Sequence, residues 1–163
     1  MAYAVVNPRL GVQPIAETST TQNHTLGTRV QAQDPTYGVG EFIYLSGVAS
    51  TAVGSWVTFN QDDNSTTLLA ANAIGPVAVA MSANVASSYG WYQIYGKAVG
   101  AALAGFVDNA NVYATATAGS VDDAVVAGDR VKLAKGASAV GTPSSGLAEF
   151  EIQYPFMDDG LAA

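Results

Sequence analysis

Few side chains in this sequence could carry out acid–base or nucleophilic chemistry. His24 is the single histidine, and the chain has no cysteine. A hydrolase triad needs a base beside its nucleophile, but no G-x-S-x-G elbow surrounds His24, which follows Thr, Gln and Asn residues. Zinc sites need several Cys or His ligands. We therefore interpret His24 as a surface residue, and we expect a protein that is not an enzyme and holds neither a metal nor a cofactor.

Adjacent carboxylates are the other candidates for chemistry, and they occur as Asp62–Asp63, Asp122–Asp123 and Asp158–Asp159. Neighbouring side chains in a strand or turn tend to point apart, which makes them poor acid–base pairs. The first pair could offer oxygen ligands to Ca²⁺, but it lacks the loop glycine and the distal glutamate of an EF-hand. No phosphate-binding loop or dinucleotide fingerprint is present. We interpret all three pairs as solvated turns.

The charge balance argues against nucleic acid and membranes as partners. The formal net charge is −7, with only six basic residues. Binding to phosphates needs a basic stripe, and the one local basic cluster, 130–135, alternates like the outer face of a strand. Anionic lipid repels an acidic chain, and no apolar run reaches the roughly 18 residues that a membrane-spanning helix needs. Asn7, Pro8 and Arg9 interrupt the apolar start of the chain, which is not typical of a signal peptide.

The segment 75–100 has the strongest strand pattern. Residues 75–81 form an uninterrupted apolar run that suits a strand buried on both faces, and 89–100 is rich in aromatic and β-branched residues. Together they predict a central β-hairpin. Side chains alternate along a strand, so Trp91 and Gln93 should point to one face and Tyr92 and Ile94 to the other. Small residues leave room for another backbone or layer to approach: Ala78, Ala80, Gly96 and Gly100.

Further strands are predicted along the rest of the chain, with turn residues every 8 to 12 positions. They fall at 40–48, 53–59, 66–70, 112–117, 125–133 and 147–154, the last ending at Pro155. Residues 53–59 and 66–70 should form a hairpin around the polar turn 60–65. This spacing predicts an all-β fold, a compact β-barrel or β-sandwich-like domain.

The ends of the chain differ from this pattern. Residues 1–40 are rich in Pro, Thr, Gln and Asn, and they predict an extended N-terminal arm with at most a short strand at 26–32. An unstructured tail is one interpretation of this composition, and its apolar residues suggest the alternative of an arm that becomes ordered against a partner. The β-rich domain is then expected at 41–155, followed by a loose tail at 156–163.

Three segments together resemble a known class of protein. They are 34–45 (DPTYGVGEFIYL), 75–80 (GPVAVA) and 90–96 (GWYQIYG). Over about residues 25 to 135 the chain resembles head decoration, or cement, proteins of tailed bacteriophages. The resemblance implies a compact β-rich protein that binds the outer capsid surface and stabilises it, as a homotrimer with its N-terminal arm on the shell. It also implies synthesis in the host cytoplasm and the major capsid protein as partner.

We expect the contacts with the capsid and between copies to be made by the arm and by the central strands. An extended arm can add a strand to an exposed sheet edge, and many weak contacts on a capsid reinforce one another. One aromatic face of 89–100 should belong to the core, and the other would be exposed unless a second subunit covered it. The predicted contact residues are Val5, Val6, Leu10, Val12, Ile15, Trp91, Tyr92 and Tyr95.

Two alternatives remain open. One is another virion component, such as a tail-tube or connector protein, which would form rings or tubes instead of trimers. The other is a carbohydrate-binding β-module in which Trp91 or Trp56 serves as the platform for a sugar. That module needs an exposed tryptophan beside polar neighbours.

Overall fold

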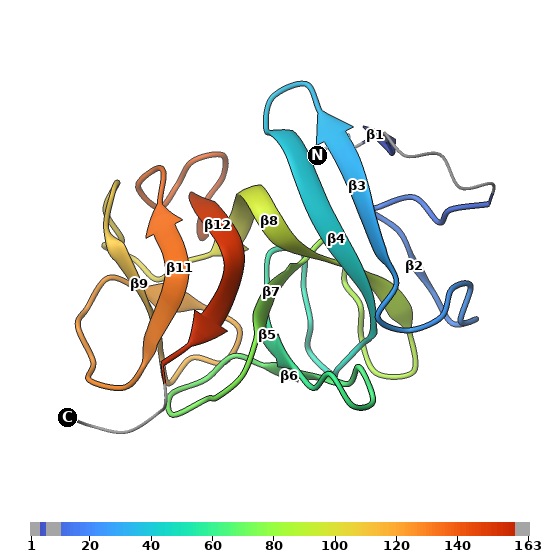
Figure 1. Ribbon diagram of the computed structural model, residues 1–163. Helices are drawn as coiled ribbons and strands as arrows, with labels where there is room; N and C mark the ends of the chain where they lie inside the picture. The colour runs from blue at the N-terminus through green and yellow to red at the C-terminus, as the bar shows by residue number, and fades with distance from the viewer. Residues whose placement is uncertain (1–3, 6–10, 159–163) are drawn as a thin grey trace.

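The computed structural model describes residues 4–5 and 11–158 of the 163-residue chain (Figure 1). This part of the protein is all-β and contains no helix, and therefore none that could cross a membrane. The all-β prediction is thus confirmed. The strands are β1 (Ala4–Val5), β2 (Thr18–Ser19), β3 (Arg29–Asp34), β4 (Gly38–Ser46), β5 (Trp56–Phe59), β6 (Thr66–Leu68), β7 (Val77–Ala80), β8 (Tyr89–Ala101), β9 (Asn111–Ala114), β10 (Val121–Asp122), β11 (Arg130–Gly136) and β12 (Leu147–Met157).

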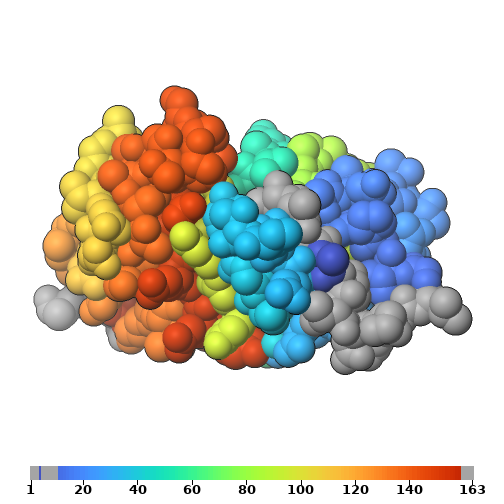
Figure 2. All heavy atoms as spheres, turned by 90° about the horizontal axis from the view of Figure 1, so that it is seen from above, coloured from blue at the N-terminus to red at the C-terminus, as the bar shows by residue number. Residues whose placement is uncertain are grey.

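The strands form one open, curled antiparallel sheet with the shape of a half-barrel. Its main path runs β1-β3-β4-β8-β12-β11-β9-β10, while β5, β6 and β7 branch from it next to β8. β8 is the longest strand, with 13 residues. One edge of β8 pairs with β4, and the other edge pairs with β2, then β7, then β12. β8 therefore joins the two ends of the sheet, which lie on opposite sides of the molecule (Figure 2).

The predicted hairpins are present. β5 pairs with β6 around the polar turn, and β7 pairs with β8 in a register that sets Val79 opposite Gln93 and Ala80 opposite Tyr92. Trp91 packs in a cluster on one face of β8, whereas Tyr92 and Ile94 pack in a cluster on the other. The alternation predicted from the sequence is therefore confirmed.

Both faces of β8 are covered by the protein's own chain over residues 90–94. Residues 11–28 lie over the Trp91 side, where Ile15 is buried and Val12 is partly buried. β5 and β7 cover the Tyr92 side. A third and larger cluster fills the C-terminal half around Trp56 and Phe150. Of the aromatic face predicted to be exposed on this strand, only Tyr95 is exposed in the single chain.

Much of the predicted N-terminal arm is part of the folded sheet. β3 pairs with β4 along its whole length, from Arg29 opposite Ile43 to Asp34 opposite Gly38. Side chains alternate along the strand, so Val30 and Ala32 are buried in the cluster with Phe42 and Tyr44. Asp34 at the end of the strand is also buried, and its Oδ1 accepts from the N–H groups of Thr36 and Tyr37. Residues 11–40 therefore belong to the domain, which corrects the boundary expected at residue 40. Residues 1–3 and 6–10 of the predicted arm lie outside the described part.

The last strand continues two residues beyond Pro155, where it was expected to end. The register between β11 and β12 is interrupted between Lys132 and Ala134, and Pro155 lies opposite this bulge. A bulge tolerates proline because no ladder hydrogen bond is required there. Met157 is buried and its N–H donates to Gly75 O at 2.9 Å, so residues 156–158 belong to the fold. Residues 159–163 of the predicted tail are not among those described.

Candidate protein-contact face

The structure separates the predicted contact residues into different environments. Ile15, Trp91 and Tyr92 are buried in the interior of the domain. These three side chains therefore belong to the core instead of making the predicted contact with another chain. Val12 is partly buried against the Trp91 cluster. Tyr95 alone among the residues from the central strand is exposed, with 41% of its surface accessible. Val5 contributes its backbone to β1, while Val6 and Leu10 lie outside the described residues.

A hydrogen-bond network around Gln13 explains why Trp91 is inside. Trp91 Nε1 donates to Gln13 O at 2.9 Å, and Tyr44 OH donates to Gln13 Oε1 at 3.1 Å. The backbone N–H of Gln13 donates to Nε2 of His24 at 3.0 Å. The His24 ring also packs edge-on against Tyr44, with ring centroids 5.0 Å apart. His24 therefore holds the segment that covers Trp91 in place, in contrast to the free surface residue expected from the sequence.

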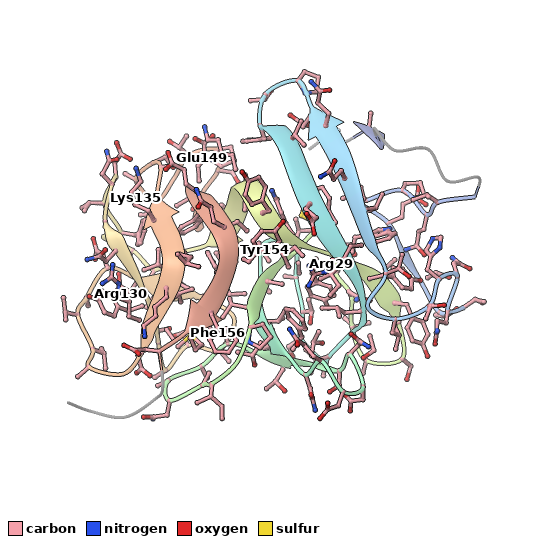
Figure 3. The ribbon with its side chains drawn as sticks, viewed as in Figure 1. Arg29, Arg130, Lys135, Glu149, Tyr154 and Phe156 are labelled. Atoms are coloured by element: carbon pink, nitrogen blue, oxygen red, sulfur yellow. The ribbon has the colours of Figure 1, made fainter. Side chains whose placement is uncertain are left out.

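Many charged and aromatic side chains that are exposed or partly exposed lie on one side of the sheet, on β3, β4, β8, β12 and β11. We call this surface the outer face. Residues paired across antiparallel strands project from the same side, and the register pairs Glu41 with Tyr95, Lys97 with Glu151, and Lys132 with Phe156. Figure 3 shows several of its side chains. The outer face comprises Arg29, Val39, Glu41, Tyr95, Lys97, Arg130, Lys132, Leu133, Lys135, Glu149, Glu151, Gln153, Tyr154, Phe156 and Asp158.

Ion pairs between neighbouring strands run across the outer face. They are Arg29–Glu41 at 3.6 Å, Lys97–Glu149 at 2.6 Å, Lys132–Asp158 at 2.6 Å and Lys135–Glu151 at 3.2 Å. The five basic residues of the described chain all lie here with four acidic ones, which gives the face a formal charge of +1 and leaves −8 for the rest of the chain. Exposed ion pairs contribute little stability, about 0–1 kcal/mol each. Their main effect is a nearly neutral surface on an acidic molecule.

A hollow between β4 and β12 lies at the centre of the outer face. It has a volume of about 290 Å³, and Tyr95 lines it together with Val39 and Gln153. Tyr154 OH donates to Glu41 Oε2 at 2.7 Å and so connects β12 with β4. The rings of Tyr95 and Tyr154 lie 5.4 Å apart. The arrangement is an aromatic hollow with a polar rim, held by contacts between residues far apart in the sequence.

Two bulky residues of this face have an unusual backbone conformation. Leu133 has φ 60° and Tyr154 has φ 54°, and both lie at the bulge between β11 and β12. Side chains other than glycine rarely occupy this region, and the conformation costs about 1–2 kcal/mol per residue. Both side chains are nevertheless exposed, Leu133 by 63% and Tyr154 by 47%. The bulge thus turns a leucine and a tyrosine toward solvent at a cost in backbone energy.

The chain matches no known family model, no curated protein and no solved structure. The described residues also contain no group of three or more His, Asp or Glu side chains that could hold a metal ion. The outer face and the sequence resemblance are therefore the two observations that bear on function. The sequence predicts strands at 130–135 and 147–154, which belong to this face, but it does not place them beside Arg29, Glu41 and Tyr95.

The contact between Tyr154 and Glu41 can be tested by titration. The hydrogen bond to the Glu41 carboxylate is the main cause that raises the pKa of Tyr154, because ionised tyrosine cannot donate it. Glu41→Gln should lower the pKa of Tyr154 toward its ordinary value, as followed by NMR of the labelled tyrosine ring carbons. A raised pKa stabilises the fold below the ordinary tyrosine pKa, and this contribution is lost as pH rises through the folded-state value.

Tyr37 provides the matched control. Burial and then the nearby Glu149 carboxylate raise the pKa of Tyr37. Glu149→Gln should therefore lower the pKa of Tyr37 and leave Tyr154 unchanged, while Glu41→Gln should do the reverse. An unchanged Tyr154 titration in Glu41→Gln would contradict the contact between β4 and β12.

Proposed function

We propose that this protein is a structural, non-enzymatic virion protein that binds the outer surface of a bacteriophage capsid and stabilises it. On this proposal it is made in the host cytoplasm and acts as a homotrimer, with the major capsid protein as its partner. The resemblance of segments 34–45, 75–80 and 90–96 to head decoration proteins supports the class. The outer face supports a role in protein contact.

The observation that carries the proposal is the composition of the outer face. Tyrosine, phenylalanine and arginine are enriched in the parts of interfaces that contribute most affinity. Here Tyr95, Tyr154 and Phe156 are exposed together, and Arg29 lies 6.0 Å from the centre of the Tyr154 ring. The ion pairs offset the charge that would otherwise repel another acidic protein. Backbone strain at Leu133 and Tyr154 is the kind that proteins retain where it serves a function.

The proposal also covers the domain type, the N-terminal arm and the contacts between copies. The compact barrel or sandwich domain of a decoration protein would carry an arm, and the packing of residues 11–40 leaves residues 1–10 for it, of which Ala4 and Val5 pair with β3 as strand β1. Deletion of residues 1–35 would also remove β3 and Ile15 and so damage the core. Contacts between copies, first expected from Trp91 and Tyr92, are assigned to the outer face.

The experiment measures binding to purified capsids that lack decoration, by sedimentation and electron cryomicroscopy. The wild-type chain should form trimers in analytical ultracentrifugation and occupy defined positions on the capsid. Deletion of residues 1–10 and the variant Tyr154→Ala should each reduce occupancy by about tenfold, the loss of roughly 1.4 kcal/mol expected for one interface anchor, with unchanged circular dichroism.

Val125→Asp is the matched control, because Val125 is the most exposed of the large apolar side chains described, lies in the loop before β11, and is not one of the residues of the outer face. It should bind like the wild type. Failure of the wild-type chain to bind capsids would refute the proposal, and rings or tubes formed by the purified protein would favour a tail-tube or connector protein instead.

The sugar-binding alternative loses its proposed platforms, since Trp56 and Trp91 are both buried.

A further inference from the structure

A second hollow lies apart from the centre of the outer face, where the β5–β6 hairpin meets the segment before β7 and the end of β12. Its volume is about 490 Å³, within the range of small-ligand sites. Three segments distant in sequence form it: residues 58–67, residues 74–76 and Phe156. We call it the hairpin groove. Phe156 lies at the lower end of β12 in Figure 3.

The apolar part of the hairpin groove is held by the fold. Phe59 is buried and forms part of the groove lining, whereas Ile74 is 70% exposed and Phe156 is 49% exposed. Phe156 is bracketed by buried neighbours, and its backbone forms an antiparallel bridge with Pro76. The backbone of β12 therefore fixes the position of Phe156, while the Phe156 side chain remains accessible to solvent.

The polar part of the hairpin groove consists of amides and hydroxyls. Asn60, Gln61, Ser65 and Thr67 are exposed in the β5–β6 hairpin, and Thr58 is partly exposed. These groups supply both hydrogen-bond donors and acceptors. None of the described residues that line the groove is charged, and the adjacent turn carries Asp62 and Asp63. An anionic ligand would therefore meet no basic side chain in the groove lining and would be repelled by the two carboxylates of the adjacent turn.

We propose that the hairpin groove binds a neutral saccharide. A sugar ring presents an apolar C–H face, which can pack on Phe156, and hydroxyl groups, which can exchange hydrogen bonds with amide and hydroxyl side chains at the same time. The combination of one exposed ring, short polar side chains and no charge in an open groove fits this ligand class. The site shares Phe156 with the outer face, but its ligand and its test differ from those of the capsid-binding proposal. It replaces the buried tryptophans as the platform for a sugar.

The test is an NMR titration of the isotope-labelled full chain with neutral oligosaccharides of glucose, mannose, galactose and N-acetylglucosamine at millimolar concentrations. At least one probe should cause saturable shifts in the backbone amides of 58–67, 74, 75 and 156. Phe156→Ala should weaken that binding by about three- to tenfold, as expected for the loss of one ring contact. Gln61→Ala, in an exposed turn, should weaken it without affecting the fold.

Tyr95→Ala is the matched control, since it removes an exposed ring of the outer face that does not line the hairpin groove. It should leave the saccharide affinity unchanged. The proposal is overturned if none of the neutral probes gives saturable shifts, if the shifts lie outside the groove, or if Phe156→Ala and Gln61→Ala both bind like the wild type. Stronger binding of an uncharged Gly-Ser-Thr peptide would also overturn it. Capsid binding is measured separately and does not depend on any of these outcomes.

Discussion

Trp91→Ala should reduce the free energy of unfolding by about 3–5 kcal/mol, the usual cost of truncating a large buried aromatic side chain. Trp91 is buried, its ring centroid lies 5.0 Å from that of Tyr44, and its Nε1 donates to Gln13 O. The substitution would leave a cavity and remove the donor to a buried carbonyl. Domains of this kind are commonly stable by only about 5–15 kcal/mol, so the loss would be a large fraction.

Urea denaturation followed by circular dichroism measures this loss, with Tyr95→Ala as control. Tyr95 lies on the same strand but is exposed, and most exposed substitutions change stability by only about 0.5 kcal/mol. A Trp91→Ala variant with wild-type stability and an altered oligomeric state would restore the interpretation of Trp91 as a subunit contact. The experiment thus decides between core and interface for the residue on which the sequence and the structure differ most.

Gly100→Ala should destabilise the protein by about 2–3 kcal/mol, at the upper end of the range for overpacking a core. A methyl group at this position would lie 2.5 Å from Trp56 Nε1 and 3.2 Å from the Phe150 ring. Those two rings meet edge to face with centroids 4.9 Å apart, so neither can move without disturbing the other. The close approach predicted at Gly100 from the sequence is therefore present, and a side chain is the group that approaches.

A double-mutant cycle separates this steric conflict from a general effect on β8. Trp56→Phe shortens the side chain that meets the added methyl group, so the combination with Gly100→Ala should be more stable than the sum of the two single effects predicts. Thermal and urea denaturation of the three variants provide the comparison. Additive effects in the double variant would show that Trp56 is not the group in conflict with the methyl.

Local sequence patterns are sufficient to predict most of the strands. The β7–β8 hairpin follows from an apolar run and an aromatic run separated by a polar break, and the two faces of β8 follow from simple alternation at Trp91, Tyr92 and Gln93. The β5–β6 hairpin follows from its polar turn. These signals are local because each depends on residues within about ten positions of one another.

The features that the sequence places wrongly all depend on contacts with residues distant in the sequence. The sequence predicts a short strand near Val30 but not its pairing with β4, so this strand falls within the predicted arm. Nothing in the irregular composition of residues 11–28 shows that they cover Trp91, because that depends on the hydrogen bonds centred on Gln13. The bulge that allows Pro155 inside β12 likewise requires the register with β11.

The outer face could not be predicted for the same reason. Its hydrogen bond between Tyr154 and Glu41 joins residues 113 positions apart. The sequence shows exposed positions on each strand separately, but strand order brings Arg29, Tyr95 and Tyr154 to one place. Three of the candidate contact residues predicted from local apolar character, Ile15, Trp91 and Tyr92, are therefore core residues.

The position of β8 in the sheet has a consequence for how the protein is made. Residues 95–101 of β8 pair with residues 147–153 of β12, which are synthesised later. A nascent chain on the ribosome thus exposes an unpaired edge of β8 until β12 has been made, and such edges readily pair with other chains. Pairing between segments this far apart is also slow. Wrong pairing between copies is therefore most probable in the interval between the synthesis of β8 and its pairing with β12.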